Sequence, residues 1–201
     1  MRILLRVSRL IDAVSVRIGL IIRWLVLAAV LISAGNAIVR KLFQTSSNAF
    51  LEIQWYLFAG VFMLGAGYTF LCNAHVRIDF VSAHFSPRTR AWIDIAGIVF
   101  FLIPFCWIMI DLGWPVFYNA WASGEMSQNA GGLIRWPVFA LLPAGVGLLL
   151  AQSASELVKR FAFLKGLIPD PTGHGHGSRP TADELSEEVA AVRKPKAGEG
   201  R

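Results

Sequence analysis

The chain has 201 residues, of which 55% are hydrophobic and only 16% are charged. Because about a quarter of the residues in a typical soluble domain are charged, this composition excludes an ordinary soluble protein. The net charge of +6 comes from basic residues that flank apolar stretches and form no stripe among aromatic residues, so nucleic acid is not an expected partner. Cys72 and Cys106 lie within or at the end of apolar runs and indicate neither a disulfide framework nor a metal site.

Residues 1–17 are predicted to form an amphipathic helix that lies in the membrane interface. At about 100° per residue, one side collects most of the charges and the other is apolar. Basic helices of this kind meet anionic headgroups through their arginines. The alternative is a frayed basic leader that only orients the first span. The charged side holds Arg2, Arg6, Arg9, Asp12 and Arg17, and the apolar side holds Ile3, Val7, Leu10, Ile11 and Val14.

Four apolar stretches follow, each long enough to cross the ~30 Å hydrocarbon core as a helix. They run over about 18–39, 53–72, 91–114 and 133–158, so residues 18–165 are expected to form a four-helix transmembrane domain. Asp94 and Asp111 fall near the two ends of the third stretch and are expected to be interfacial. Residues 166–201 contain too few apolar residues to fold and are expected to form a disordered tail. The expected fold class is an all-α integral membrane protein.

The middle of the second stretch carries small residues at helical spacing. Gly60 and Gly67 are seven residues apart and lie on one face, beside Ala59 and Ala66. Small side chains allow two membrane helices to approach closely, so this face is expected to pack against another helix. The alternative is that glycine is simply common in membrane helices.

The distribution of basic residues near the span ends predicts the topology. Cytoplasmic segments carry an excess of Lys and Arg, so the predicted location is the bacterial inner membrane with both termini in the cytoplasm. The inner segments then hold Arg2, Arg6, Arg9, Arg17, Arg23, Arg77, Arg88, Arg90, Lys159, Arg160 and Lys165, and the outer segments hold Arg40, Lys41 and Arg135.

Three polar residues near the outer ends of the first two stretches are structural candidates. Asn36 is placed to hydrogen-bond to another helix, or to water at the interface. Arg40 ends the first stretch and Glu52 opens the second across a short turn, so antiparallel packing predicts that they face each other. A partly desolvated pair there would stabilise the helical hairpin.

A compact polar cluster follows the second stretch and consists of His75, Arg77 and Asp79. It is too charged to lie in lipid and is expected at the headgroup layer. Arg77 and Asp79 are expected to hold the loop between spans two and three against the bundle or a partner. The alternative is an exposed basic loop that serves topology alone.

No catalytic or cofactor motif is found in the sequence. It contains no Ser-His-Asp order, no HExxH, no glycine-rich phosphate loop and no histidine pair inside the spans. A haem anchor needs axial ligands within the bundle, whereas His75 and His84 belong to a loop. We therefore expect no enzyme activity and no cofactor, with a structural or redox membrane anchor as the alternative function.

The order and spacing of several polar and small residues resemble the small, DctQ-like membrane subunit of tripartite ATP-independent periplasmic (TRAP) transporters. The resemblance extends over roughly residues 10–162. It is carried by Asn36, Arg40, Phe43, Glu52, the Gly-Ala-Gly run at 65–67, the His-x-Arg-x-Asp run at 75–79 and the WPVFALLPAG run at 136–145.

The resemblance implies a function and a set of partners. Family members pair with a large multi-span subunit that moves the substrate and with a soluble periplasmic binding protein that delivers it. A sodium gradient supplies the energy, the sodium is bound by the large subunit, and the substrates are typically carboxylates. The small subunit acts as a scaffold, which agrees with four spans that show no internal inverted repeat.

Overall fold

The computed structural model describes residues 2–44, 48–72 and 85–169. The predicted all-α fold class is confirmed, because these residues contain no β-strand and only one isolated bridge, between Met126 and Ile134. Four of their helical stretches are long and apolar enough to cross a membrane. The elements are α1 (Arg2–Phe43), α2 (Asn48–Leu71), α4 (Pro87–Gly97), the π-helical turn η1 (Ile98–Leu102), α5 (Ile103–Ser123) and α6 (Trp136–Leu164). Most of the predicted disordered tail, residues 170–201, lies outside the described residues.

The observed helices run past the predicted ends of the spans. The predicted interfacial helix over 1–17 and the first span form one continuous helix, α1. At 1.5 Å per residue α1 is about 63 Å long, roughly twice the thickness of the hydrocarbon core, so it must extend beyond the core or cross it at a steep tilt. The third span continues to Ser123, and the fourth begins about three residues later than predicted, at Trp136, but continues to Leu164. Hydropathy marks where apolar sequence ends, whereas a helix ends where its backbone hydrogen bonds end.

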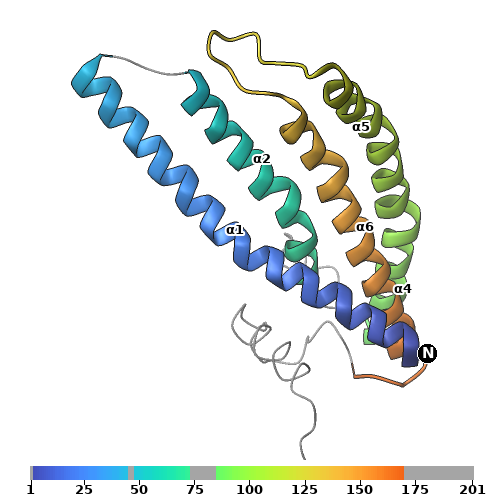
Figure 1. The fold of residues 1–201 in the computed structure, drawn as a ribbon. Coiled ribbons are helices and arrows are strands. Elements are labelled where there is room, and N and C mark those ends of the chain that lie inside the picture. The colour runs from blue at the N-terminus through green and yellow to red at the C-terminus, as the bar shows by residue number, and fades with distance from the viewer. Residues whose placement is uncertain (1, 45–47, 73–84, 170–201) are drawn as a thin grey trace, which may run out of the picture.

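The helix α6 is the centre of the bundle and packs against α1, α2 and α5. The helices follow the spatial order α1, α2, α6, α5 (Figure 1), and the first turns of α1 cross the last turns of α6. We call this crossing, together with the adjoining α4, the network end. The opposite end, where residues 124–135 connect α5 to α6, is called the loop end.

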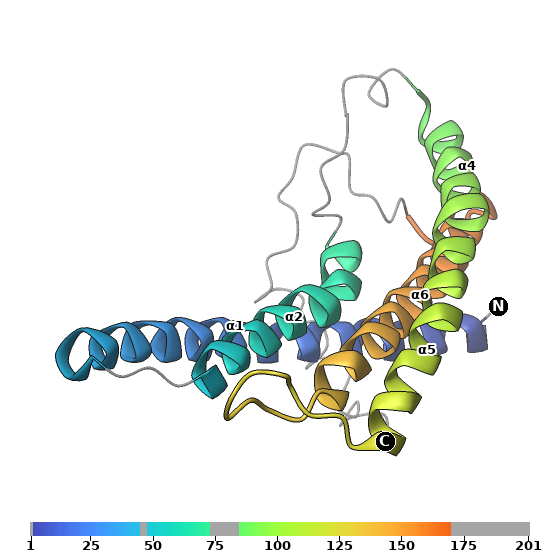
Figure 2. The same cartoon turned by 90° about the horizontal axis from the view of Figure 1, so that it is seen from above.

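The helices α4 and α5 form one curved rod, joined by η1 (Figure 2). Within η1 the backbone N–H of Ile103 donates to the carbonyl of Ile98, five residues earlier. Pro104 follows directly, and proline has no N–H and clashes with the carbonyl four residues before it. The wider π turn relieves that clash and lets the rod bend without a break.

Glycines allow α2 and α6 to approach each other closely. A Cβ on Gly67 would lie 3.4 Å from the carbonyl oxygen of Leu148, and one on Gly60 would lie 3.7 Å from Leu25 of α1 and 3.9 Å from Leu141 of α6. The tightest approach is at Gly145, where a Cβ would come within 2.6 Å of the carbonyl carbon of Met63. Lipid supplies no hydrophobic drive for helix association, so such backbone contacts carry much of the packing.

A pair of alanine substitutions on α6 tests this close approach. Gly145→Ala forces α2 away from α6 and should destabilise the protein by about 1 to 3 kcal/mol. Gly147→Ala is the matched control, because nothing lies within 4 Å of its Cβ position. Its better helix propensity should stabilise by up to about 1 kcal/mol. Thermal unfolding in detergent measures both; equal effects of the two substitutions would contradict the packing described.

Candidate functional site

The buried polar side chains of the described residues gather at the two ends of α6. At the loop end, Glu52 of α2 binds the connection between α5 and α6. At the network end, a line of charged residues joins α4, α6 and α1. These two sites are the candidates for function.

Glu52 is only 6% exposed, and its carboxylate accepts three hydrogen bonds from residues 124–135. Ser127 Oγ donates to Oε1, Asn129 Nδ2 donates to Oε1 at 2.8 Å, and the backbone N–H of Leu133 donates to Oε2 at 2.7 Å. Both oxygens are thus bound by donors from the connection. We call this arrangement the Glu52 clasp.

Two neighbours of Glu52 extend the clasp along one face of α2. Asn48 Nδ2 donates to the carbonyl of Ala130 at 3.1 Å, and Tyr56 Oη donates to that of Ile134 at 3.0 Å. Positions four apart share a helix face, so Asn48, Glu52 and Tyr56 all reach the same connection. The face therefore holds the connection as one unit.

The predicted pairing of Arg40 with Glu52 is wrong. Arg40 lies in the last turn of α1 and is exposed, and no ion pair within the described residues involves it. The physical reason is that α2 begins at Asn48, so Glu52 lies one turn inside the helix and faces the connection to α6.

The other predicted residues have different outcomes. Gly60 and Gly67 are buried in α2, at the contacts with α1 and α6 described above. Asn36 is half-buried on α1, and no described residue hydrogen-bonds to its side chain. The remaining candidates lie outside the described residues; they are His75, Arg77 and Asp79.

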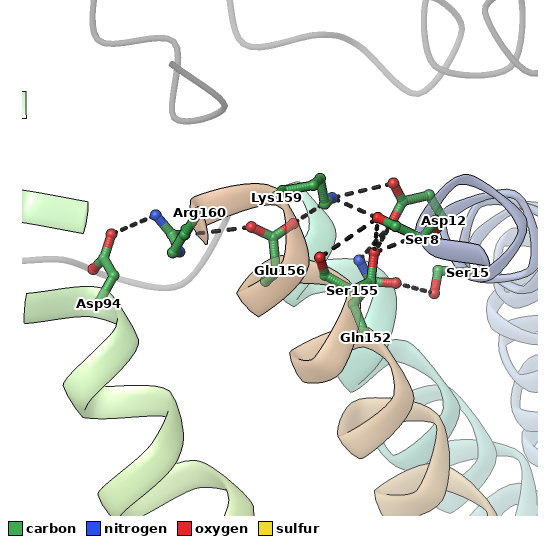
Figure 3. Close-up of polar contacts among 9 residues, drawn as sticks. All are labelled: Ser8, Asp12, Ser15, Asp94, Gln152, Ser155, Glu156, Lys159 and Arg160. Atoms are coloured by element: carbon green, nitrogen blue, oxygen red, sulfur yellow. Dashed lines mark hydrogen bonds and ion pairs between the residues drawn. The ribbon is translucent and has the colours of Figure 1, made fainter. Parts of the chain in front are cut away.

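A line of alternating charges crosses the network end (Figure 3). Arg160 Nη1 lies 2.6 Å from Asp94 Oδ2, and its Nη2 lies 3.6 Å from Glu156 Oε2. Lys159 Nζ lies 2.5 Å from Glu156 Oε1 and 3.1 Å from Asp12 Oδ2. The order Asp94, Arg160, Glu156, Lys159, Asp12 thus runs from α4 through α6 to α1, and we call it the charge network.

Neutral polar groups surround Asp12 where α1 meets α6. Gln152 Nε2 and Ser155 Oγ each donate to Asp12 Oδ1 at 2.8 Å. Ser15 Oγ donates to Gln152 Oε1 at 2.7 Å, and the hydroxyls of Ser8 and Ser155 lie 2.7 Å apart. Ser8, Asp12 and Ser15 therefore form the face of α1 that contacts α6.

Burial makes these charges depend on one another. The side chain of Arg160 is 1% exposed and that of Glu156 is 5% exposed. A buried charge without a partner is costly, so removing one member leaves its neighbours uncompensated. The network has three carboxylates for two cations, and the donors from Gln152 and Ser155 help to satisfy the third, on Asp12.

The sequence interpretation missed this network. It grouped Asp12 with the arginines of α1 and used Lys159 and Arg160 only for topology. A usable signal was present, because Ser8, Asp12 and Ser15 recur at helical spacing and so do Gln152, Ser155 and Lys159.

The arrangement of both sites is structural. No group of three or more metal-ligating side chains occurs in the part of the chain that the structure describes. The charges of the network and the carboxylate of Glu52 are bound by other groups of the same chain. The geometry of both sites thus stabilises contacts between helices.

Four apolar helices fixed to one another by polar contacts at both ends define a multi-span helical membrane protein. A family model described as "Tripartite ATP-independent periplasmic transporters, DctQ component" matches residues 29–163. The match covers more than half of the chain, so the chain belongs to this family of TRAP transporter components. No curated protein and no solved structure matches the chain significantly.

The clasp predicts how the connection between α5 and α6 responds to mutation. Glu52→Ala removes the acceptor for three donors and should raise the rate of proteolytic cleavage within residues 124–135 about tenfold or more. Arg40→Ala is the control and should leave that rate unchanged, since Arg40 is exposed and forms no ion pair with described residues. Equal cleavage of both variants would show that the clasp does not hold the connection.

The charge network predicts a large effect at Arg160. Arg160→Met leaves Asp94 and Glu156 without their shared cation and should destabilise the protein by about 3 to 5 kcal/mol. Lys165→Ala, at an exposed residue just after α6, should change stability by no more than about 0.5 kcal/mol. Unfolding in detergent compares the two, and a loss below about 1 kcal/mol for Arg160→Met would rule out the network as a stabilising element.

Proposed function

We propose that this chain is the small permease subunit of a TRAP transporter. In this role it scaffolds a large multi-span subunit for sodium-gradient-driven uptake of an organic acid, which a periplasmic binding protein delivers. The observation that carries the proposal is the family match over residues 29–163, which includes the second part of α1, all of α2 and α5, and all of α6 except its last residue.

The polar groups of the chain support a scaffold role. Transport sites in secondary carriers use discontinuous helices whose ends point at the substrate near the middle of the membrane. Here the described helices are continuous, apart from the π turn, and the buried charges at both ends of α6 bind one another or the chain itself. The substrate and sodium sites are therefore assigned to the large subunit.

The proposed orientation follows from the charges at the two ends. The network end carries more basic residues than the loop end, and cytoplasmic segments are enriched in Lys and Arg. The network end is therefore placed in the cytoplasm of a bacterial cell and the loop end in the periplasm. The network end carries Arg6, Arg9, Arg17, Arg88, Arg90, Lys159, Arg160 and Lys165, and the loop end carries Arg40, Lys41 and Arg135.

Deletion of the gene tests the proposed function. We expect uptake of one or more radiolabelled carboxylates to be lost in the deletion strain, restored by the wild-type gene, and abolished when external sodium is replaced by choline. A large multi-span protein should copurify with the tagged wild-type chain from native membranes. Full uptake in the deletion strain, with no such protein copurified, would refute the proposal.

A further inference from the structure

The outer face of α5 carries an acidic residue that has no partner among the residues that the structure describes. Asp111 is exposed, and no described residue forms an ion pair or hydrogen bond with its carboxylate. Buried residues of α5 face α6 instead, at Cys106, Gly113 and Ala120. These three recur every seven residues, and Asp111 lies on the opposite side of the helix.

Contacts between α5 and α6 place Asp111 near the middle of the span. A Cβ on Gly113 would meet Leu142, which fixes the register of the two antiparallel helices. By the helical rise, Asp111 then lies about 12 Å from the level of Trp136 and about as far from that of Gln152. At the level of Trp136, its ring contacts that of Trp121, with centroids 4.6 Å apart. At the level of Gln152, the polar contacts of the network end begin.

This depth differs from the sequence interpretation, which put Asp111 near the end of a span over 91–114. The reason is that α5 continues to Ser123, so the helix extends well beyond Trp114. An ionised carboxylate at mid-depth costs several kcal/mol when it faces lipid, and such residues almost always face protein or water. Aspartate has one methylene group, so it is too short to reach a headgroup layer about 12 Å away.

The residues around Asp111 have the composition of a protein interface. Trp107 and Trp114 are one turn to either side and are 70% and 55% exposed, and Tyr118 follows on the same face at 58%. Tryptophan and tyrosine are enriched among the residues that contribute most to binding at protein interfaces, and here they flank the charge. Nothing in the described part of the chain covers this face.

We propose that the face of α5 formed by Trp107, Asp111, Trp114 and Tyr118 binds a transmembrane helix of the large subunit that presents an Arg or Lys at mid-depth. The inference rests on the proposed function. Charge complementarity selects the occupant, because a cation from a protein helix neutralises the carboxylate and lipid chains cannot. Trp107 and Trp114 then shield the pair from lipid.

Substitution of Asp111 tests the proposal in the full complex. Asp111→Asn and Asp111→Leu should reduce the amount of large subunit that copurifies with the tagged chain by about tenfold or more. Leu112→Ala is the control, because Leu112 is 65% exposed at the same depth on another side of α5, and it should change nothing. The purified chain alone should melt at an equal or higher temperature with Asp111→Leu, because the substitution removes an unpaired charge from an apolar face.

Undiminished copurification with both substitutions would overturn the proposal and leave the proposed function intact. If the wild-type chain copurifies no multi-span protein, the proposed function fails and this inference fails with it. A photocrosslinking residue at Trp107 or Trp114 gives a second measurement that does not depend on mutant folding. We expect a crosslink to the large subunit, and crosslinks to lipid alone would also overturn the proposal.

Discussion

The guanidinium group of Arg160 is buried, and its charge requires the carboxylates of Asp94 and Glu156 on either side. Lys159 continues the line to Asp12, so the first turns of α1, the last turns of α6 and the middle of α4 share one set of charges. Neither α1 nor α4 can leave α6 without uncovering a charge, which is far more costly than losing an apolar contact. The network therefore fixes the arrangement of three elements that lie far apart in the sequence.

Beyond the charge network, the helices are held together by two other kinds of contact. Lipid provides no hydrophobic drive between helices, so the middle of the bundle relies on close packing at small residues such as Gly67 and Gly145. The Glu52 clasp fixes the opposite end of α2 to the connection before α6. The outside of the bundle carries large exposed aromatic side chains, including Trp55 of α2 and Trp107 of α5. A helix bundle with fixed ends and exposed aromatic side chains is consistent with membership of a family of transporter components.

Much of the fold could be predicted from the sequence, because apolar stretches of about 20 residues report directly on helices that cross a membrane. Helix bounds could not, since α1 and α5 continue through residues that hydropathy assigns to other segments. Glu52 was singled out as an acid at a span entrance, but its partners lie in a distant connection whose hydrogen bonds follow no periodicity. Helical periodicity distinguishes only a charged side of α1 from an apolar side, so Asp12 was grouped with the arginines. The contact of Asp12 with Lys159 depends on the crossing of α1 and α6, which periodicity does not predict.

The most direct test of this account is a double-mutant cycle on Asp12 and Lys159, the contact that joins α1 to α6. The free energy of unfolding of the purified chain would be measured for Asp12→Asn, Lys159→Met and the double variant. Because both side chains share one partly buried network, we expect the two effects to be coupled by about 1 to 3 kcal/mol. Additive effects, within about 0.5 kcal/mol, would show that the charges act independently and that α1 is held by other contacts.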